Sequence, residues 1–438
     1  MAEAAALGAP DGRPLWGVPF AVKDNIDVAG MPTTAACPAA SRLAARDAHA
    51  VGALRAAGAI PIGKTNLDQF ATGLVGTRTP YPVPMNALDP AIVPGGSSSG
   101  SAVAVARGIV AFALGTDTAG SGRVPAALNG IVGLKPTVGT LSATGMIPAC
   151  RTLDTISVFA QTTACAWAVY RAAAVFDPSD GHARPAATGP LFAVLGARVG
   201  VPDARTLAGL CEPAQAADFA AVRDRLAAGG ATLATFDFAP FAAVAAMLYE
   251  GAWLAERVAA VGARLTEAPS TLHPVTRAIL EPGLALTAVD AFRGFYRLAD
   301  LRRASATAIA GCDVLCLPSI PGFVTLEAIA ADPIGPNAWL GTFTNFVNLL
   351  DLCGIAVPTG DRADGRPGGV TVLAPAGRDA LAASVAAGIE AGRMGATGWT
   401  RPAPPAAAPG PAPAAAALAV CGAHMSGLPL NGDRTRAG

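Results

Sequence analysis

Charged side chains are scarce in this sequence. Asp, Glu, Lys and Arg make up 14% of its 438 residues, and the formal net charge is +0, whereas about 25% charged residues is usual. A neutral chain has no electrostatic attraction for nucleic acid or for an anionic membrane, so we expect neither as a partner. Hydrophobic residues reach 52%, which is enough for a large core. The length predicts one large domain or two to three ordinary ones.

A leader sequence and long apolar runs are also missing. The first residues, "MAEAAALGAPDGRPLWG", have neither the basic segment nor the apolar segment of a secretory signal peptide. The apolar stretch 101–115 is interrupted by Arg107 and Gly108, and no run approaches the roughly 18 residues of a membrane-spanning helix. We therefore expect no membrane association and a cytoplasmic location.

Cysteine is present, but its pattern indicates neither disulfides nor a metal site. The eight cysteines are scattered along the chain, at positions 37, 150, 165, 211, 312, 316, 353 and 421. This scatter predicts buried free thiols of a cytosolic protein rather than a disulfide framework. Cys312 and Cys316 have no other type of ligand near them, and no histidine–carboxylate spacing suggests a metal. We expect no metal and no cofactor.

The scarcity of histidine and lysine narrows the choice of a catalytic base. Of four histidines, only His49 is a candidate neighbour of a glycine- and hydroxyl-rich segment, so a Ser-His-Asp triad is not favoured. Lys23, Lys64 and Lys135 are the only lysines beside 28 arginines (31 basic residues minus 3). Unlike arginine, lysine loses its proton readily when buried. Lys23 follows the apolar segment "GVPFAV" and therefore suits a base, although chance in an arginine-rich composition is the alternative.

The alternation of short apolar runs predicts an α/β fold. Strand-like and helical segments follow one another, which is typical of a sheet with helices on both faces. We expect strands at 17–22, 59–63, 109–117, 312–319, 354–360 and 368–375, helices at 50–58, 66–74 and 100–108, and a helix, turn and strand within 213–238. One domain is expected over 1–400, a Pro- and Ala-rich linker over 401–417, and the stub of a truncated C-terminal domain over 418–438.

The segment "GAIPIGKT" (58–65) matches the phosphate-loop pattern G-x-x-x-x-G-K-T at every position. A phosphate loop follows a strand and has flexible residues whose amides surround the phosphates. Here a helix is expected before Gly58, and Ala-Ile-Pro-Ile is typical of a strand, whose proline has no amide hydrogen. We therefore interpret Lys64 as structural and assign no nucleotide site.

Two segments rich in glycine and hydroxyl residues, "GGSSSGS" (95–101) and "GTDTAGSG" (115–122), carry the candidate chemistry. The strand 109–117 leads into a tight turn, in which the amides of Thr118, Ala119 and Gly120 can converge on an oxyanion. Ser121 lies at the edge of this turn, where a nucleophile is needed. A serine of the 97–99 cluster can relay the proton of Ser121 to Lys23. A flexible loop is the alternative interpretation of each segment taken alone.

Three segments resemble the amidase signature family: "GVPFAVKDNIDVAGMPTTAACPA" (17–39), "GGSSSGSAVAVA" (95–106) and "GTDTAGSGRVPAALNGIVGLKPT" (115–137). The resemblance implies an α/β amidase signature fold, with a large mixed central β-sheet covered by helices on both faces. It also implies a Ser-cisSer-Lys triad, with Ser121 as nucleophile, Ser97 as bridging serine in a cis peptide with the preceding glycine, and Lys23 as base.

Within that family, the segments 140–162, 248–261, 341–360 and 420–432 are most similar to allophanate hydrolases. This resemblance implies hydrolysis of allophanate through an acyl-enzyme, with release of ammonia. It assigns Tyr249 and Arg257, eight residues apart near one helix face, to the substrate carboxylate; a core tyrosine and a surface arginine are the alternative. Asp117 and Arg123 are expected to brace the catalytic loop.

The chain departs from the family pattern at both ends. In the family, helices ahead of residue 15 often carry dimer contacts, so the sequence leaves undecided whether the chain forms a homodimer. Pro94 stands where a small residue is common in the family. Three alternatives remain: a family member that acts on another small amide, a glutaminase-type subunit of a tRNA amidotransferase, and an inactive truncated homologue.

Overall fold

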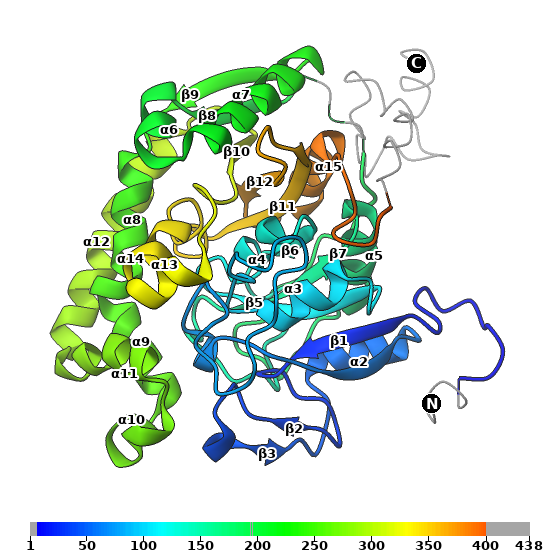
Figure 1. Ribbon diagram of the computed structural model, residues 1–438, viewed down its shortest axis with the longest axis vertical. Helices are drawn as coiled ribbons and strands as arrows, with labels where there is room; N and C mark the ends of the chain where they lie inside the picture. The colour runs from blue at the N-terminus through cyan, green and yellow to red at the C-terminus, as the bar shows by residue number, and fades with distance from the viewer. Residues whose placement is uncertain (1–6, 193, 195, 400–438) are drawn as a thin grey trace, which may run out of the picture. The chain divides into compact units, whose positions relative to one another are not determined.

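A mixed β-sheet is the centre of the computed structural model (Figure 1), which describes residues 7–192, 194 and 196–399. Within these residues the sheet has ten strands in the order β4-β1-β5-β7-β6-β11-β12-β10-β8-β9. They are β1 (Pro19–Lys23), β4 (Ile60–Thr65), β5 (Phe112–Asp117), β6 (Val132–Lys135), β7 (Thr155–Ala160), β8 (Arg198–Pro202), β9 (Thr232–Phe236), β10 (Val314–Pro318), β11 (Leu352–Asp361) and β12 (Pro367–Pro375). A separate two-stranded sheet pairs β2 (Pro32–Thr33) with β3 (Arg42–Leu43). The predicted α/β class with a large mixed sheet is confirmed.

Helices cover both faces of the sheet, as predicted. Helices α2, α5 and α15 pack on one face, and α3 and α4 pack on the other (Figure 1). The described helices are α2 (His49–Ala56), α3 (Ser99–Ala106), α4 (Val124–Leu128), α5 (Thr163–Ala173), α6 (Ala204–Leu210), α7 (Pro213–Ala228), α8 (Ala239–Glu250), α9 (Ala252–Val261), α10 (Arg264–Glu267), α11 (Pro274–Leu280), α12 (Ala288–Ala308), α13 (Leu326–Ala331), α14 (Gly335–Leu340) and α15 (Asp379–Ile389).

Strands β1 and β5 are parallel neighbours, and this pairing positions the candidate site. Their register aligns Phe20 with Phe112, and the two buried rings stack with centroids 4.9 Å apart. Parallel strands end at the same edge of a sheet. The side chain of Lys23, which ends β1, therefore meets the residues that end β5, up to Asp117.

The predicted helix at 66–74 is wrong. The structure has only a short 3-10 turn there, in which Phe70 has φ 49° and Ala71 has φ 53°. Polar side chains of the segment bind distant backbone instead: Asp68 accepts from the amides of Gly76 and Arg78, at 2.9 Å each. Tertiary hydrogen bonds therefore override the local helical preference.

The segment that matches a phosphate loop is a strand, as we inferred from its residues. Residues Ile60–Thr65 form β4, which pairs in parallel with β1. The amine of Lys64 forms an ion pair with Asp24 at 3.0 Å and donates to the carbonyl of Pro32. The backbone of this segment is thus used for sheet pairing, and Lys64 has the structural role expected of it.

Cysteine burial differs in part from expectation. All seven described cysteines are free, and Cys37, Cys150, Cys316 and Cys353 are buried. Cys165, however, is exposed on α5, and Cys211 and Cys312 are half-buried. The expectation of buried thiols is therefore wrong for these three, because their segments lie at the periphery of the core.

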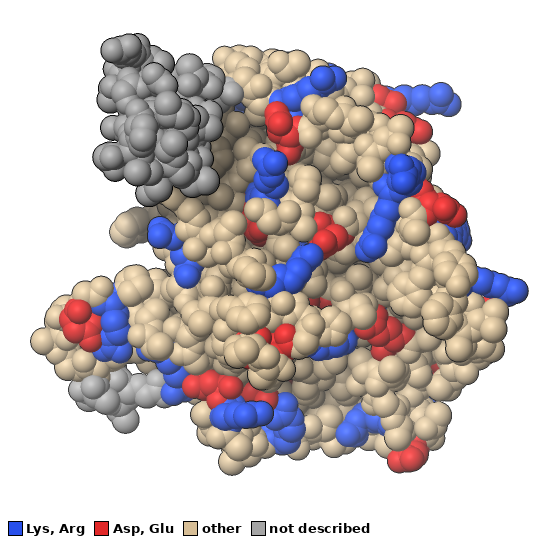
Figure 2. Space-filling view, turned by 180° about the vertical axis from the view of Figure 1, so that it is seen from behind, with Lys and Arg blue, Asp and Glu red and all other residues tan. Residues whose placement is uncertain are grey.

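The described surface carries both signs of charge. On the face drawn in Figure 2, Lys and Arg side chains lie interspersed with Asp and Glu rather than in a patch of one sign. Within the described ranges, no helix has the length and apolarity to cross a membrane. The predicted linker at 401–417 and the predicted stub at 418–438 lie outside the described residues.

The stacked pair between β1 and β5 provides a test of this core. Phe20→Ala should lower the free energy of unfolding by roughly 3–5 kcal/mol, because it removes a fully buried ring and leaves a cavity. Chemical denaturation measures the change. Phe292→Ala is the matched control, since Phe292 is exposed on α12, and it should have a much smaller effect. Equal losses in the two variants would contradict the assignment of Phe20 to the core.

Candidate active site

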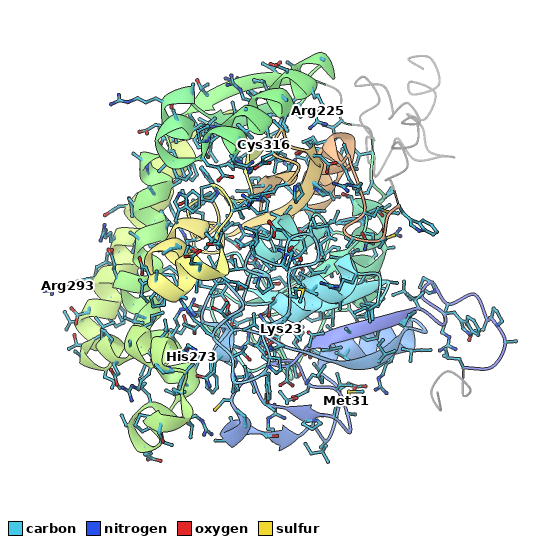
Figure 3. The ribbon with its side chains drawn as sticks, in the orientation of Figure 1. Lys23, Met31, Arg225, His273, Arg293 and Cys316 are labelled. Carbon is cyan, nitrogen blue, oxygen red and sulfur yellow. The ribbon has the colours of Figure 1, made fainter. Side chains whose placement is uncertain are left out.

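The amine of Lys23 lies in the interior of the molecule at the end of β1 (Figure 3). Its Nζ atom donates to the hydroxyl of Ser97 at 2.7 Å and to that of Thr116 at 2.6 Å. Among the described residues it forms no ion pair. A buried amine that touches two hydroxyls and no carboxylate is an unusual arrangement, because a buried ammonium normally requires a paired charge.

Burial lowers the pKa of Lys23 from its ordinary value to about 7. The negative charges of Asp68, Asp154 and Asp117 act in the opposite direction but do not outweigh desolvation. Near neutral pH a large fraction of the amine is therefore uncharged. In that form Nζ has a free lone pair and can accept the proton of Ser97 across the same contact.

Ser97 is brought to Lys23 by the segment that leads into α3. The peptide bond between Gly96 and Ser97 is cis, as the family resemblance implies. A Cβ atom at Gly96 would lie 1.9 Å from Oδ2 of Asp68, so only glycine fits this crossing. Ser97 itself is fully buried.

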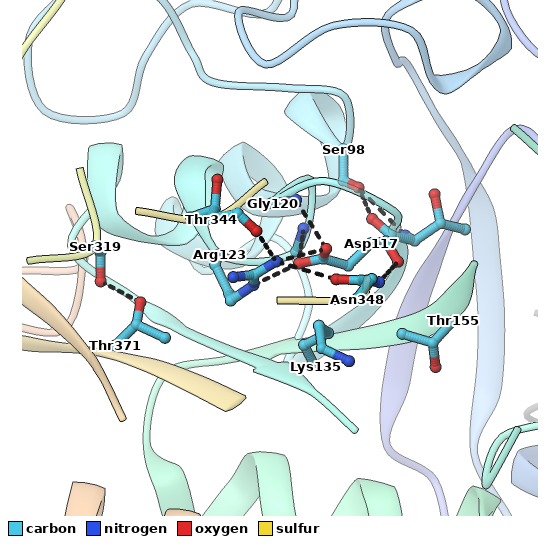
Figure 4. Close-up of polar contacts among 12 residues, drawn as sticks. Ser98, Asp117, Gly120, Arg123, Lys135, Thr155, Ser319, Thr344, Asn348 and Thr371 are labelled. Carbon is cyan, nitrogen blue, oxygen red and sulfur yellow. Dashed lines mark hydrogen bonds and ion pairs between the residues drawn. The ribbon is translucent and has the colours of Figure 1, made fainter. Parts of the chain in front are cut away.

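A buried ion pair holds the loop after β5. Arg123 donates to both carboxylate oxygens of Asp117 at 2.9 Å, and both side chains are fully buried (Figure 4). The same carboxylate accepts from the amides of Gly120 and Gly122. Asn348 donates to the Asp117 carbonyl at 2.9 Å. Burial alone would raise the pKa of Asp117, but Arg123, Lys135 and the amide of Gly122 hold it below its usual value. The predicted bracing role of Asp117 and Arg123 is confirmed.

Ser121 lies in this braced loop with 2% of its surface exposed. The glycines beside it leave no room for a larger residue: a Cβ at Gly120, whose φ is 129°, would lie 2.3 Å from Oγ1 of Thr344. A Cβ at Gly122 would lie 2.6 Å from the Cβ of Ser157. Among the described residues, no hydrogen bond joins the hydroxyls of Ser97 and Ser121. In the described part of the chain, the structure therefore contains the Lys23–Ser97 contact of the expected relay but not the hydrogen bond between Ser97 and Ser121.

One of the three expected oxyanion donors is already occupied. The amide of Gly120 donates to Oδ1 of Asp117 at 2.8 Å, so our expectation for Gly120 needs correction. The bracing carboxylate competes for this donor, a role that the sequence pattern does not reveal. The amides of Thr118 and Ala119 have no acceptor in the part of the chain that the structure describes. They are available for an oxyanion.

Tyr249 and Arg257 are brought together, but not on one helix as we expected, because the extended backbone of Gly251 separates α8 from α9. Tyr249 lies near the end of α8 and Arg257 on α9, and the guanidinium carbon is 5.1 Å from the centre of the tyrosine ring. Arg257 is 2% exposed and its contact with Thr72 is long at 3.5 Å. Its Nε atom has no hydrogen-bond partner among the residues that the structure describes. Although burial disfavours the charge, nearby Cys150 and Tyr249 help to raise the pKa of Arg257. A buried, incompletely bonded guanidinium can bind a carboxylate.

Three residues of the site were missed from the sequence. Thr116 contacts Lys23, Thr72 contacts Arg257, and Asp154 accepts a hydrogen bond from the hydroxyl of Thr118. Thr116 could have been found from the parallel pairing of β1 with β5. Thr72 and Asp154 give no local signal, because long-range contacts alone bring them here. Among the described residues, no cluster of His, Cys, Asp and Glu is arranged to hold a metal.

Comparison with known proteins agrees with this geometry. The model of the Amidase family matches residues 1–382. A urea amidolyase of Saccharomyces cerevisiae is 45% identical over 363 residues, which cover 82% of this chain and 20% of that protein. The chain therefore spans about a fifth of the length of this curated relative.

Two further likenesses cover more of the other protein. The structure of selenomethionine-substituted Kluyveromyces lactis allophanate hydrolase superposes with a TM-score of 0.85 at 37% identity, over 99% of this chain and 74% of that one. A glutamyl-tRNA(Gln) amidotransferase subunit of Aromatoleum aromaticum is 34% identical over 408 residues, which cover 84% of this chain and 82% of that protein.

The buried ion pair of the loop allows a direct test. Asp117→Ala leaves the fully buried Arg123 without its partner, and we expect the free energy of unfolding to fall by roughly 3–5 kcal/mol. Denaturant titration measures this loss. The control is Asp11→Ala, which breaks the exposed pair between Asp11 and Arg13 and should leave stability unchanged within error. A stable Asp117→Ala protein would contradict the bracing role.

Proposed function

The chain belongs to the amidase family, and on that premise we propose that it hydrolyses an amide, with allophanate as its substrate. One observation carries the proposal. A buried lysine, with its pKa lowered to about 7, holds Nζ 2.7 Å from the hydroxyl of Ser97, beside a braced loop that carries a second serine. This is the arrangement needed to activate a serine without histidine or metal.

The proposed reaction begins with proton transfer. Neutral Lys23 accepts the proton of Ser97, which in turn accepts the proton of Ser121. The Ser121 oxygen attacks the terminal amide carbon of allophanate. The negative charge that develops on the carbonyl oxygen is stabilised by the amides of Thr118 and Ala119, where one such donor is typically worth about 3–4 kcal/mol.

Collapse of the tetrahedral intermediate releases the products. The amide C–N bond breaks, the leaving nitrogen takes the proton held on the relay, and ammonia departs. Water then attacks the ester carbon of the acyl-enzyme and gives its proton to the relay. The C–O bond to Ser121 breaks, which frees the acid product and restores the serine hydroxyl.

The proposed substrate rests on the anion-binding groups. Allophanate carries one carboxylate next to its amide, and Arg257 with Tyr249 offers a buried cation and a phenol for it. The likenesses to a urea amidolyase and to an allophanate hydrolase support the same substrate. We further propose a cytoplasmic location, which the free thiols of the described cysteines support.

A second candidate is the glutaminase-type subunit of a tRNA amidotransferase. Its support is the 34% identity to an amidotransferase subunit over most of both chains. The two candidates differ in the charge next to the reacting amide. An allophanate hydrolase should depend on Arg257, whereas a glutaminase should release ammonia from glutamine.

Ammonia release from allophanate, malonamate, glutamine and acetamide tests the proposal. We expect the wild-type protein to prefer allophanate and malonamate, the two anionic amides, over glutamine and acetamide. Ser121→Ala should lose at least about 10⁴-fold in kcat because it lacks the nucleophile. Arg257→Met should raise KM for allophanate by roughly 10- to 100-fold, because charged hydrogen bonds are lost, and should spare acetamide.

Two results would overturn allophanate as the proposed substrate. One is equal hydrolysis of acetamide and allophanate, and the other is the same change in KM for both amides in Arg257→Met. Preference for glutamine would favour the second candidate. A folded wild-type protein that releases no ammonia from any of the four amides would overturn the amidase activity itself. Tyr249→Phe removes only the phenol hydroxyl and keeps the ring beside the guanidinium, so it should raise KM for allophanate less than Arg257→Met does.

The lowered pKa of Lys23 predicts a particular pH dependence. The base must be uncharged, so kcat/KM should rise with pH through an apparent pKa near 7 and fall about tenfold per pH unit below it. A pH–rate profile between pH 5 and 9 measures this limb. Lys135→Met is the control: burial lowers the pKa of Lys135 to about 8, and its removal should not move the limb. A kcat/KM that still rises about tenfold per pH unit up to the end of this range would indicate that Lys23 remains charged and cannot be the base.

A further inference from the structure

Residues 145–154, the last part of the loop between β6 and β7, contact three parts of the candidate site: the turn after Lys23, the loop after β5, and α9. This segment begins beside the turn that follows Lys23. Asn25 and Ile147 exchange two hydrogen bonds, at 2.8 and 3.0 Å, and Ile26 pairs with Met146 in an isolated antiparallel bridge. The first part of the loop therefore holds the turn that follows the proposed base.

The end of the same loop holds the proposed oxyanion donors. The hydroxyl of Thr118 donates to Oδ1 of Asp154, and the amides of Ala149 and Cys150 donate to Oδ2 at 2.7 and 3.1 Å. Asp154 is 3% exposed, and burial raises its pKa to about 6. At neutral pH it is therefore mostly a carboxylate, and three donors converge on it.

The middle of the loop contacts the helix of the proposed anion-binding arginine. The thiol of Cys150 donates to the carbonyl of Trp253 at 3.4 Å. The amide and hydroxyl of Thr152 donate to the two carboxylate oxygens of Glu256 at 2.8 and 2.7 Å. Both acceptors are on α9, as is Arg257. One short segment thus joins the base, the oxyanion loop and the anion-binding helix.

We propose that Asp154 is a positioning residue of the reaction: it orients Thr118, and with it the oxyanion amides, against the loop that carries Ser121. The inference rests on the proposed function. Asp154 touches none of the reacting atoms in this arrangement and acts through Thr118. Asp154 accepts from all three neighbours, which are two amides that can only donate and the Thr118 hydroxyl, which donates in this arrangement. An asparagine would turn an NH₂ group toward at least one of those donors.

Asp154 also sets the electrostatic environment of Lys23. Three carboxylates lie near this amine, Asp68, Asp117 and Asp154, and each favours its charged form. Removing one negative charge makes protonation of Lys23 less favourable. Loss of Asp154 should therefore move the acid limb of the pH profile to lower pH, a change that a residue with only a structural role would not cause.

The experiment compares Asp154→Asn with the wild-type protein by two readouts. The first is the pH profile of ammonia release from whichever amide the wild-type protein hydrolyses. The second is the rate at which an alkyl fluorophosphonate labels Ser121. We expect kcat to fall by about tenfold or more, because misplaced oxyanion donors are costly. The labelling rate should fall with it, and the acid limb should shift to lower pH.

Asp379→Asn is the matched control. Asp379 is also a buried carboxylate that fastens a loop, since it accepts from the amide and hydroxyl of Thr137 at 2.7 and 2.6 Å. It is not among the charges that act on Lys23. Its variant should leave the acid limb in place. An Asp154→Asn protein with an unmoved limb, or with kcat within about threefold of wild type, would overturn the proposal.

A second pair of variants decides the matter if Asp154→Asn does not fold. Thr118→Ser keeps the hydroxyl that Asp154 accepts from, and Thr118→Val removes it at nearly the same volume. We expect Thr118→Val to lose clearly more kcat than Thr118→Ser, and equal kcat values in the two variants would overturn the proposal. The labelling readout separates the two ideas. If no amide is hydrolysed but the Asp154 variant still labels more slowly than wild type, the proposed function fails and the positioning role stands.

Discussion

The site depends on one constraint, the burial of the Lys23 amine without a carboxylate in contact. Desolvation is the largest influence on this group, and it outweighs three nearby acidic residues. If Asp68, Asp117 or Asp154 formed an ion pair with Nζ, the ammonium would be stabilised and could not accept a proton. Each carboxylate instead accepts hydrogen bonds from another group: Asp68 from backbone amides, Asp117 from Arg123, and Asp154 from Thr118.

The rest of the site follows from the need to hold two loops against this amine. The parallel pairing of β1 with β5 brings Lys23 to the loop that carries Ser121. That loop has no regular secondary structure of its own until α4, so the ion pair between Asp117 and Arg123 supplies its rigidity. Preorganised donors are effective because they need not reorganise during the reaction, and a fully buried bidentate pair is a suitable way to keep them fixed.

The proposed anion site is built differently. Arg257 lies on a helix rather than on a strand end, and its position relative to the oxyanion loop depends on contacts made by residues 145–154. Within the described part of the chain, the buried Nε atom of its guanidinium has no hydrogen-bond partner. A buried polar group without a partner costs free energy. A carboxylate ligand would relieve part of that cost, which fits a site that selects anionic amides.

The sequence alone determined the local parts of this protein. Short apolar runs between turn residues were sufficient for β1, β4 and α3, and the amphipathic period was sufficient for α2. The spacing of serine, glycine and lysine indicated which side chains are candidates for the chemistry, and the family resemblance indicated the cis peptide before Ser97.

What only the tertiary structure decided was how neighbouring groups compete for hydrogen bonds. Residues 66–74 appeared helical by pattern, but Asp68 binds the amides of Gly76 and Arg78 instead. The amide of Gly120 appeared free for an oxyanion, but Asp117 accepts from it. Asp154 had no local signal at all. Each of these carboxylates has several possible donors nearby, and only the packing of the folded chain decides which donors it takes.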